Sequence, residues 1–129
     1  MDVQQPNRSF LHKRLKSFAY AFQGFIFLFK NEHNSRIHLL AGVLVTAAGI
    51  YYDVGLIQWA ILTVCICGVF VAELFNTAIE KTIDLVSPGK NPVAGMIKDL
   101  SAAAVLVTAI GALICGGLVF YPYIFKQLS

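Results

Sequence analysis

Charged residues are scarce in this chain, and long apolar runs are abundant. Of the 129 residues only 13% are charged, whereas 57% are hydrophobic, and the mean hydropathy is +0.70. A single domain of this length could not bury so much apolar surface in a water-soluble core. The composition therefore argues against a soluble protein and predicts a membrane protein whose apolar side chains are covered mostly by the bilayer.

The sequence also lacks the motifs of several common functional classes. It has no internal repeat, no low-complexity stretch and no G-x-x-x-x-G-K-[ST] phosphate loop, so any nucleotide has to be held in another way. Its three cysteines are Cys65 and Cys67, on different sides of one helix, and Cys115 in a separate apolar run. We therefore expect packing residues, and neither a disulfide framework nor a tetrahedral metal site.

Three apolar segments are predicted to cross the membrane. Residues 55–72 form an uncharged run of 18 residues, and residues 102–120 are about long enough to cross the hydrocarbon. The run at 39–52 is shorter and could also suit a buried or re-entrant helix, but a helical continuation back through Arg36 extends it. We expect transmembrane helices at about 36–52, 55–86 and 93–121, within a single domain over residues 1–129.

The segment before the first span is predicted to lie on the membrane surface, at about residues 8–30. Its apolar residues recur mostly every three or four positions, opposite Lys13 and Lys16. Such an amphipathic helix would place basic side chains among anionic headgroups and phenylalanine rings at the acyl boundary. A plain membrane anchor is the alternative.

The basic residues predict how the chain is oriented. Nine of the ten Lys and Arg residues precede the first span or flank the loop at 87–94, and the exception is Lys126. Because loops rich in Lys and Arg stay in the cytoplasm, we expect a cytoplasmic amino terminus and loop, with the turn at Asp53 and the carboxyl terminus outside.

An acidic stripe follows the second apolar run. Five polar residues fall within a sector of roughly 100° on a helix, namely Glu73, Asn76, Thr77, Glu80 and Asp84. Carboxylates at membrane depth are costly, and they persist when they face a bundle interior or bind a cation. A functional site is therefore the main interpretation, and an interfacial helix end whose acids lie in water is the alternative.

The predicted start of the third helix places the basic residue Lys98 close to this stripe. Ser87-Pro88-Gly89 ends the second span, and Asn91-Pro92 offers a cap followed by a proline, so the third helix should begin near Val93. Lys98 and Asp99 then lie about two turns into that helix, level with the end of the stripe. Lys98 could neutralise one of the last two acids of the stripe or hold a phosphate.

Two histidines lie close to Glu32, ahead of the first span. The five-residue spacing of His33 and His38 fits no simple metal-binding pair on one helix face. We therefore expect both histidines to lie at the level of the lipid headgroups.

Together these residues resemble the small prokaryotic integral-membrane lipid kinases, which comprise diacylglycerol kinase and its undecaprenol kinase relatives. Residues 73–80, ELFNTAIE, with Asp84 following, match the family pattern E-x-x-N-[ST]-[AS]-[IV]-E-x-x-x-D at every specified position. Further matches are Asn31-Glu32, Lys98-Asp99 and Tyr20-x-x-x-Gly24. The similarity extends over about residues 13–118.

The resemblance implies an all-α trimeric helical bundle in the bacterial cytoplasmic (inner) membrane. Each subunit of the homotrimer would have three transmembrane helices and an amphipathic surface helix, with active sites shared between neighbours at the cytoplasmic face. The implied cofactors are ATP, as the phosphate donor, and Mg²⁺, and no nucleic-acid partner is expected. Phosphoryl transfer needs a base near the acceptor hydroxyl, a metal on the triphosphate and cations near the phosphates.

The residues of the stripe can be given roles in such a reaction. Glu73, nearest the hydrocarbon, is suited to act as the general base on a lipid alcohol. Glu32 and Glu80, with Asn76 assisting, supply the hard oxygen ligands that Mg²⁺ prefers. By resemblance, Lys98 would contact phosphate, Asp84 and Asp99 the ribose or base region of the nucleotide, and Tyr20, Lys13 and Lys16 its outer side.

The lipid substrate is predicted from residues 32–38. Their sequence, EHNSRIH, is similar to the E-x-N-x-R-I-H pattern of undecaprenol kinases, whereas diacylglycerol kinases carry an acidic residue where His38 lies. We expect ATP-dependent phosphorylation of undecaprenol to undecaprenyl phosphate, with diacylglycerol to phosphatidic acid as the alternative within the family.

Two functions of a different class are the alternatives to a lipid kinase. A small oligomeric channel or transporter could line a pore with Glu73, Asn76 and Glu80, but the spans offer few polar positions through the bilayer. A non-catalytic membrane subunit would predict gaps in the catalytic set, whereas every specified acid and Lys98 are present. Both classes are therefore less favoured than a lipid kinase.

Overall fold

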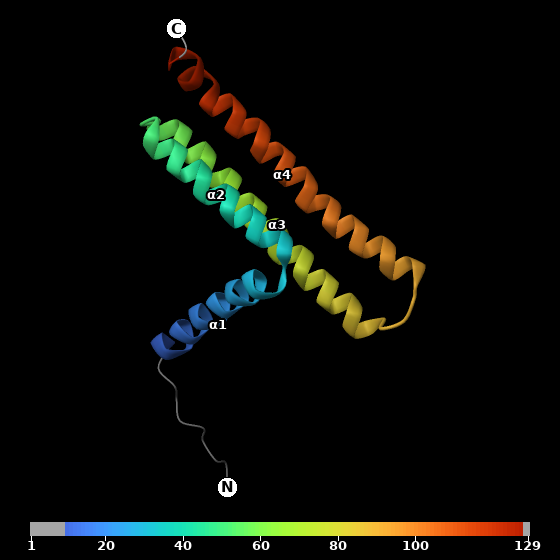
Figure 1. The fold of residues 1–129 in the computed structure, drawn as a ribbon. Coiled ribbons are helices and arrows are strands. Elements are labelled where there is room, and N and C mark those ends of the chain that lie inside the picture. The colour runs from blue at the N-terminus through green and yellow to red at the C-terminus, as the bar shows by residue number, and fades with distance from the viewer. Residues whose placement is uncertain (1–9, 128–129) are drawn as a thin grey trace.

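The computed structural model describes residues 10–127, and this part of the chain is almost entirely helical (Figure 1). Its helices are α1 (Phe10–Asn31), α2 (His33–Tyr51), α3 (Leu56–Val86) and α4 (Pro92–Gln127). Within the described range there is no strand, which confirms the all-α fold class. The predicted start of the surface helix at residue 8 lies outside the described residues.

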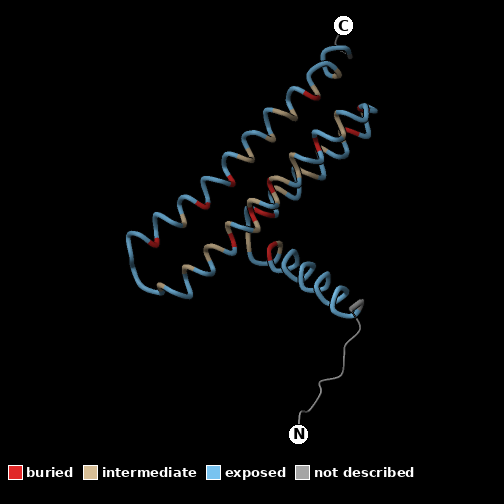
Figure 2. Tube along the Cα trace, turned by 180° about the vertical axis from the view of Figure 1, so that it is seen from behind, coloured by how far each residue is buried: buried red, intermediate tan, exposed pale blue. Residues whose placement is uncertain are grey.

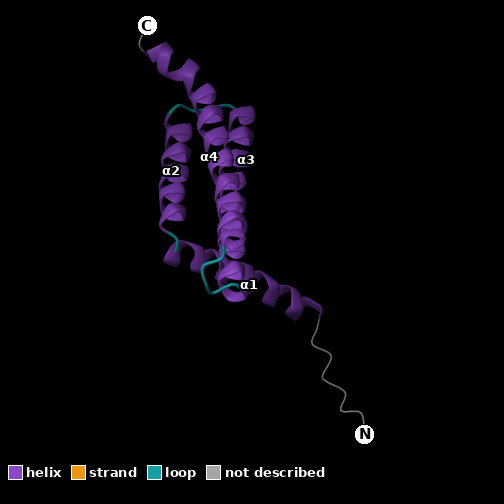
Figure 3. Ribbon diagram, turned by 90° about the vertical axis from the view of Figure 1, so that its right-hand side faces the viewer, coloured by secondary structure: helices purple, strands orange, loops and turns teal. Residues whose placement is uncertain are grey.

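The helices α3 and α4 form a long antiparallel hairpin, and α2 lies beside α3 (Figures 1 and 3). The packing between α3 and α4 is the most extensive of the fold, while α2 packs mainly on α3. Helix α1 leaves the start of α2 at a wide angle and crosses the base of the bundle, where it contacts both α2 and α3. The acidic stripe lies in the part of α3 nearest this junction.

Two of these helices, α3 and α4, are long and apolar enough to cross a membrane, with mean hydropathies of 2.0 and 2.4 in their most apolar windows. Only 17% and 11% of those windows are buried within the chain, and few residues of either helix are buried in Figure 2. Their apolar faces are therefore left for lipid or for neighbouring chains. Helix α2 begins with several polar residues and is less apolar overall, so the third span stays a prediction. The trimer also stays a prediction.

Arg36 fixes the junction between α1 and α2. The last carbonyls of a helix have no partner within that helix. Arg36 donates from Nε to the carbonyl oxygen of Phe29 at 2.8 Å and from Nη2 to that of Lys30 at 2.6 Å. The side chain of Asn31 donates to the carbonyl oxygen of Phe27 at 2.8 Å. Arg36, used above only for topology and lipid pattern, therefore also caps α1 and sets its direction.

The boundaries around the second loop follow local sequence signals. Helix α3 ends at Val86, directly before the predicted break, and Pro92 is the first residue of α4. Asn91 accepts a hydrogen bond at Oδ1 from the backbone N–H of Val93 at 2.9 Å, as expected for a cap. At the carboxyl end the helix continues through Pro122 to Gln127, and the membrane limit expected at about 121 stays a prediction. Pro122 has no backbone N–H, so the hydrogen bond to the carbonyl oxygen of residue 118 is missing within this helix.

The end of the bundle opposite α1 holds an apolar cluster. Its buried members are Val54, Leu62 and Val119, and the partly buried side chains packed on them are Val45, Tyr52, Trp59, Phe120 and Tyr123. Asp53, in the turn between α2 and α3, has a φ of 49°, a left-handed conformation that aspartate tolerates better than most residues. This cluster holds α2, α3 and α4 together at one end and leaves the other end for the polar residues.

Gly49 allows α2 to lie against the ring of Trp59. A Cβ atom at position 49 would come within 2.7 Å of Trp59 Cη2 and 3.0 Å of Cζ2. We expect Gly49→Ala to displace the indole and to lower the free energy of unfolding by about 1–3 kcal/mol, measured by thermal unfolding in detergent. Gly111→Ala is the matched control, because a Cβ there meets nothing within 4 Å. Equal unfolding midpoints for the two variants would contradict this packing.

Candidate active site

Glu73 of α3 is a buried carboxylate held by two side chains of α2. It is 3% exposed, and Ser35, which is fully buried, donates from Oγ to its Oε2 at 3.0 Å. His38 Nε2 lies 3.2 Å from the other carboxylate oxygen, Oε1. That approach is not aligned as a hydrogen bond, so within the described residues Oε1 has no hydrogen-bond partner. Oε2 of Glu73 is therefore held by Ser35, while Oε1 contacts His38 but accepts no hydrogen bond from the described residues.

Sequence reasoning missed this arrangement. It gave Ser35 no role, and it placed His38 at headgroup level and linked it to the choice of lipid without predicting a contact with Glu73, whereas His38 is 23% exposed and packs against Glu73. The partners of Glu73 come from more than 30 positions away in the chain, which no pattern within α3 could reveal. The only available signal was the spacing of Ser35 and His38, three residues apart and so on one face of a helix.

The next turn of the stripe forms a second polar group with α4. Asn76 donates from Nδ2 to Glu80 Oε1 at 3.2 Å. Ser101, a buried residue of α4, lies with its Oγ 2.7 Å from Asn76 Oδ1 and 2.8 Å from the carbonyl oxygen of Lys98, and it can donate its one proton to either. Asn76 thus orients Glu80, while its own oxygen is engaged by Ser101.

Two ion pairs lie at the more exposed end of the stripe. Lys98 of α4 contacts Asp84 of α3, whose side chain is 56% exposed, so the ion-pair interpretation of Lys98 is observed. Lys81 Nζ lies 3.6 Å from Glu32 Oε1. Ion pairs this exposed contribute little net stability, and a ligand can replace one partner at small cost. The contact of Lys98 with phosphate stays a prediction.

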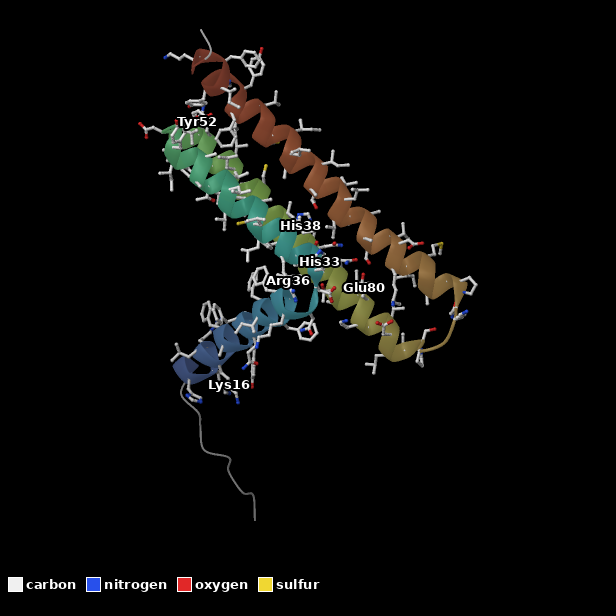
Figure 4. The ribbon with its side chains drawn as sticks, in the orientation of Figure 1. Lys16, His33, Arg36, His38, Tyr52 and Glu80 are labelled. Carbon is white, nitrogen blue, oxygen red and sulfur yellow. The ribbon has the colours of Figure 1, made fainter. Side chains whose placement is uncertain are left out.

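The predicted nucleotide residues of α1 lie apart from the stripe within one chain. Lys13, Lys16 and Tyr20 are exposed, and Lys16 Nζ lies 5.7 Å from the centre of the Tyr20 ring. Lys16 lies toward the far end of α1 in Figure 4, whereas Arg36, His38 and Glu80 lie near the junction of α1, α2 and α3. Asp99 is also exposed and makes no hydrogen bond or ion pair with any other described residue.

The oxygen donors suit a metal ion that arrives with a nucleotide. Among the described residues no three His, Cys, Asp or Glu side chains form a metal cluster. Glu32 and Glu80, however, are only partly buried and offer carboxylate oxygens. Mg²⁺ is usually bound through one or two protein carboxylates together with substrate phosphates, so these two residues fit that kind of site.

An apolar cavity of about 150 Å³ lies next to the buried carboxylate. It is bounded by side chains of α2, α3 and α4, including Ala41, Leu62, Phe70 and Ala112. His38 lines the cavity and also contacts Glu73. His38 therefore lies between this apolar cavity and the buried carboxylate of Glu73, and the exposed ion pair of Lys98 and Asp84 lies further along α3.

Fold and site together define a membrane-embedded helical protein with a polar centre at one end of its bundle. The family described as prokaryotic diacylglycerol kinase matches residues 19–120, and the chain belongs to this family of lipid kinases. The resemblance drawn from the acidic motif is thereby confirmed, and membership implies a kinase that uses ATP as phosphate donor and acts on a lipid.

Individual relatives carry two different names. The undecaprenol kinase of Bacillus subtilis is 37% identical over 116 residues, which cover 90% of this chain and 94% of that protein. The diacylglycerol kinase of Synechocystis is 39% identical over 109 residues, 84% of this chain but 62% of that protein. The diacylglycerol kinase of Pseudomonas aeruginosa is 33% identical over 98 residues, 75% of this chain and 79% of that protein. The family is thus shared by kinases of two lipid alcohols.

Proposed function

We propose that this chain transfers the γ-phosphoryl group of ATP, with Mg²⁺, to the hydroxyl of undecaprenol at the cytoplasmic face of the inner membrane. The observation that supports this most strongly is the environment of Glu73, a buried carboxylate with one oxygen that accepts no hydrogen bond, in contact with a histidine that lines an apolar cavity. Such a group can take the proton of an alcohol whose tail stays in the bilayer. The cytoplasmic face is where ATP is available.

In the proposed reaction the acceptor hydroxyl gives its proton to Glu73 as its oxygen bonds to the γ-phosphorus. The bond between that phosphorus and the bridging oxygen of ADP breaks, and the products are the lipid phosphate and ADP. Ser35 keeps Oε2 of Glu73 in place during the transfer. Afterwards Glu73 releases its proton to water.

The metal and nucleotide would lie on the exposed side of Glu73. Glu32 and Glu80 would hold Mg²⁺, with Asn76 orienting Glu80, and the bound ion would neutralise charge on the triphosphate. Lys98 exchanges its exposed partner Asp84 for a phosphate, which leaves Asp84 and Asp99 for the ribose or base. In a homotrimer with shared sites, Lys13, Lys16 and Tyr20 of a neighbouring chain would contact the outer side of the nucleotide.

Two observations favour undecaprenol over diacylglycerol, which is the second candidate. The undecaprenol kinase of Bacillus subtilis aligns with 90% of this chain at 37% identity. Residues 32–38 also carry the E-x-N-x-R-I-H pattern of undecaprenol kinases, which includes His38. The test is to offer both alcohols to the purified protein in lipid micelles, at matched surface concentration, and to compare initial rates. A higher rate on undecaprenol is expected, and a preference for diacylglycerol would replace it as the substrate.

His38 is expected to influence the choice of lipid, because it lines the apolar cavity and contacts the proposed base. His38→Glu places a second carboxyl group against Glu73 and makes the cavity wall acidic. We expect the ratio of the rate on undecaprenol to the rate on diacylglycerol to fall by roughly ten-fold. His33→Glu, the same substitution at an exposed position of α2, is the control. An unchanged ratio in His38→Glu would remove His38 from lipid selection.

A further inference from the structure

Thr77 differs from every other threonine of the chain. A threonine within a helix commonly bonds its hydroxyl to the carbonyl oxygen four residues earlier. The other four do so, namely Thr46 to Gly42 at 2.8 Å, Thr63 to Trp59 at 2.8 Å, Thr82 to Ala78 at 2.8 Å and Thr108 to Ala104 at 3.0 Å. Thr77 is the buried one, 6% exposed, and its Oγ1 has no hydrogen-bond partner among the described residues.

A buried hydroxyl without a partner is destabilising, and native proteins rarely leave one without a reason. Thr77 could satisfy its hydroxyl at the carbonyl oxygen of Glu73, as the other threonines do with theirs. Because it does not, Oγ1 is available for a group that this single chain does not supply. The environment of Thr77 therefore points to a ligand rather than to packing alone.

The second buried side-chain atom without a partner, within the described part of the chain, is Oε1 of Glu73. Glu73 and Thr77 lie one turn apart on the same face of α3, where Cβ atoms are separated by about 5–6 Å. Since Ser35 donates to Oε2 of Glu73, Oε1 and Thr77 Oγ1 are the two buried side-chain atoms of the described residues that have no hydrogen bond, and Oε1 also lies 3.2 Å from His38 Nε2. The carboxylate oxygen Oε1 of Glu73 can only accept a hydrogen bond from an alcohol. The hydroxyl of Thr77 can donate a hydrogen bond to the oxygen of that alcohol.

We propose that Thr77 binds the acceptor alcohol, donating from Oγ1 to the lipid hydroxyl oxygen while that hydroxyl donates to Glu73 Oε1. This inference rests on the proposed function and adds a substrate-binding residue to it. The two contacts would fix the rotation of the acceptor hydroxyl, so that its proton points at the base and a lone pair is left for the γ-phosphorus. Thr77 would thus recognise the hydroxyl that undecaprenol and diacylglycerol share, and His38 the lipid that carries it.

The test compares Thr77→Val with Thr77→Ser. Valine has nearly the same shape but no hydroxyl, so we expect kcat/KM for the lipid to fall roughly ten-fold while the KM for ATP stays unchanged. The loss should be equal on both alcohols, and Thr77→Ser should restore most of the rate. Thr82→Val is the matched control, because Thr82 is exposed on the same helix and its hydroxyl already bonds to the carbonyl of Ala78.

A binding measurement separates this inference from the proposed function. Native mass spectrometry of the protein in detergent, without ATP, can compare the retention of a short polyprenol by wild type and by Thr77→Val. Weaker binding to the valine variant is expected, and it would support Thr77 even if the wild type transferred no phosphate.

Two results would overturn the role of Thr77. The first is equal binding of the polyprenol and wild-type lipid kinetics in Thr77→Val. The second is a lower unfolding midpoint or an altered oligomer in Thr77→Val with lipid binding unchanged, which would show that Thr77 packs against a neighbouring chain instead.

Discussion

Glu73→Gln is expected to abolish most phosphate transfer to lipid while leaving the binding of Mg·ATP nearly unchanged. Glutamine keeps the length and shape of the side chain, and its amide oxygen can still accept the hydrogen bond from Ser35. It cannot take a proton from an alcohol at neutral pH, so the rate should fall by roughly 10²- to 10⁴-fold. Initial rates in mixed micelles and equilibrium binding of the nucleotide measure the two effects separately.

The control for this substitution is Asp53→Asn. It makes the same change of carboxylate to amide at an exposed turn residue on the opposite end of the bundle, where asparagine also tolerates a positive φ. Wild-type rates are expected for it. Substantial turnover by Glu73→Gln would show that another group removes the acceptor proton, and a loss of nucleotide binding would mean that Glu73 contacts the nucleotide or its metal.

Glu80→Ala is expected to weaken the binding of Mg·ATP itself. The substitution removes a proposed metal ligand and also the acceptor of the Asn76 amide, so the ground state is affected as well as the transition state. The Mg²⁺ concentration that gives half the maximal rate should rise by roughly 10- to 100-fold. A titration of Mg²⁺ at fixed ATP measures the change.

Glu80→Gln separates the two contributions of this side chain. Its amide oxygen can still accept the hydrogen bond from Asn76, but it no longer offers a charged ligand to a metal ion. A similar requirement for extra Mg²⁺ in both variants is expected. If Glu80→Gln behaves as the wild type and only Glu80→Ala is impaired, Glu80 orients Asn76 and does not hold the metal. Unaltered Mg²⁺ dependence in both would remove Glu80 from the site.

Much of the fold could be predicted because it depends on neighbours in the sequence. The break after Val86 and the start of α4 at Pro92 follow from prolines, a glycine and an asparagine cap within a few positions. The long apolar runs predicted α3 and α4 in the same way. The helix itself continues to Gln127, beyond the membrane limit predicted at about 121, because a helix can extend past the apolar run that crosses the bilayer.

The sequence could predict which site residues share one face of α3, but not which residues of other helices contact them. A turn of about 100° per residue placed Glu73 and Thr77 on one face of α3, and both are buried there. The two contacts of the Glu73 carboxylate, a hydrogen bond to Oε2 and an approach to Oε1, come from Ser35 and His38 of α2. Such contacts depend on how two helices pack, which residue spacing within either helix does not determine.

Two further features required coordinates for similar reasons. Ser101 reaches Asn76 across the interface of α3 and α4, although the two residues are 25 positions apart. Thr77 was only one member of the stripe in the sequence, and its hydroxyl became distinctive when the other threonines were seen to bond to their own helices. Residue type and spacing do not show that a hydroxyl lacks a hydrogen bond.

The most direct test of the account is to follow the γ-phosphate of labelled ATP into lipid. Purified protein in micelles with Mg²⁺ would be given undecaprenol, diacylglycerol or no alcohol, and the label in the extracted lipid would be counted for wild type and Glu73→Gln. Label is expected only when an alcohol is present, with more label in undecaprenol and almost none with Glu73→Gln. No label from folded, Mg²⁺-supplied wild type with either alcohol, or equal label from both proteins, would contradict it.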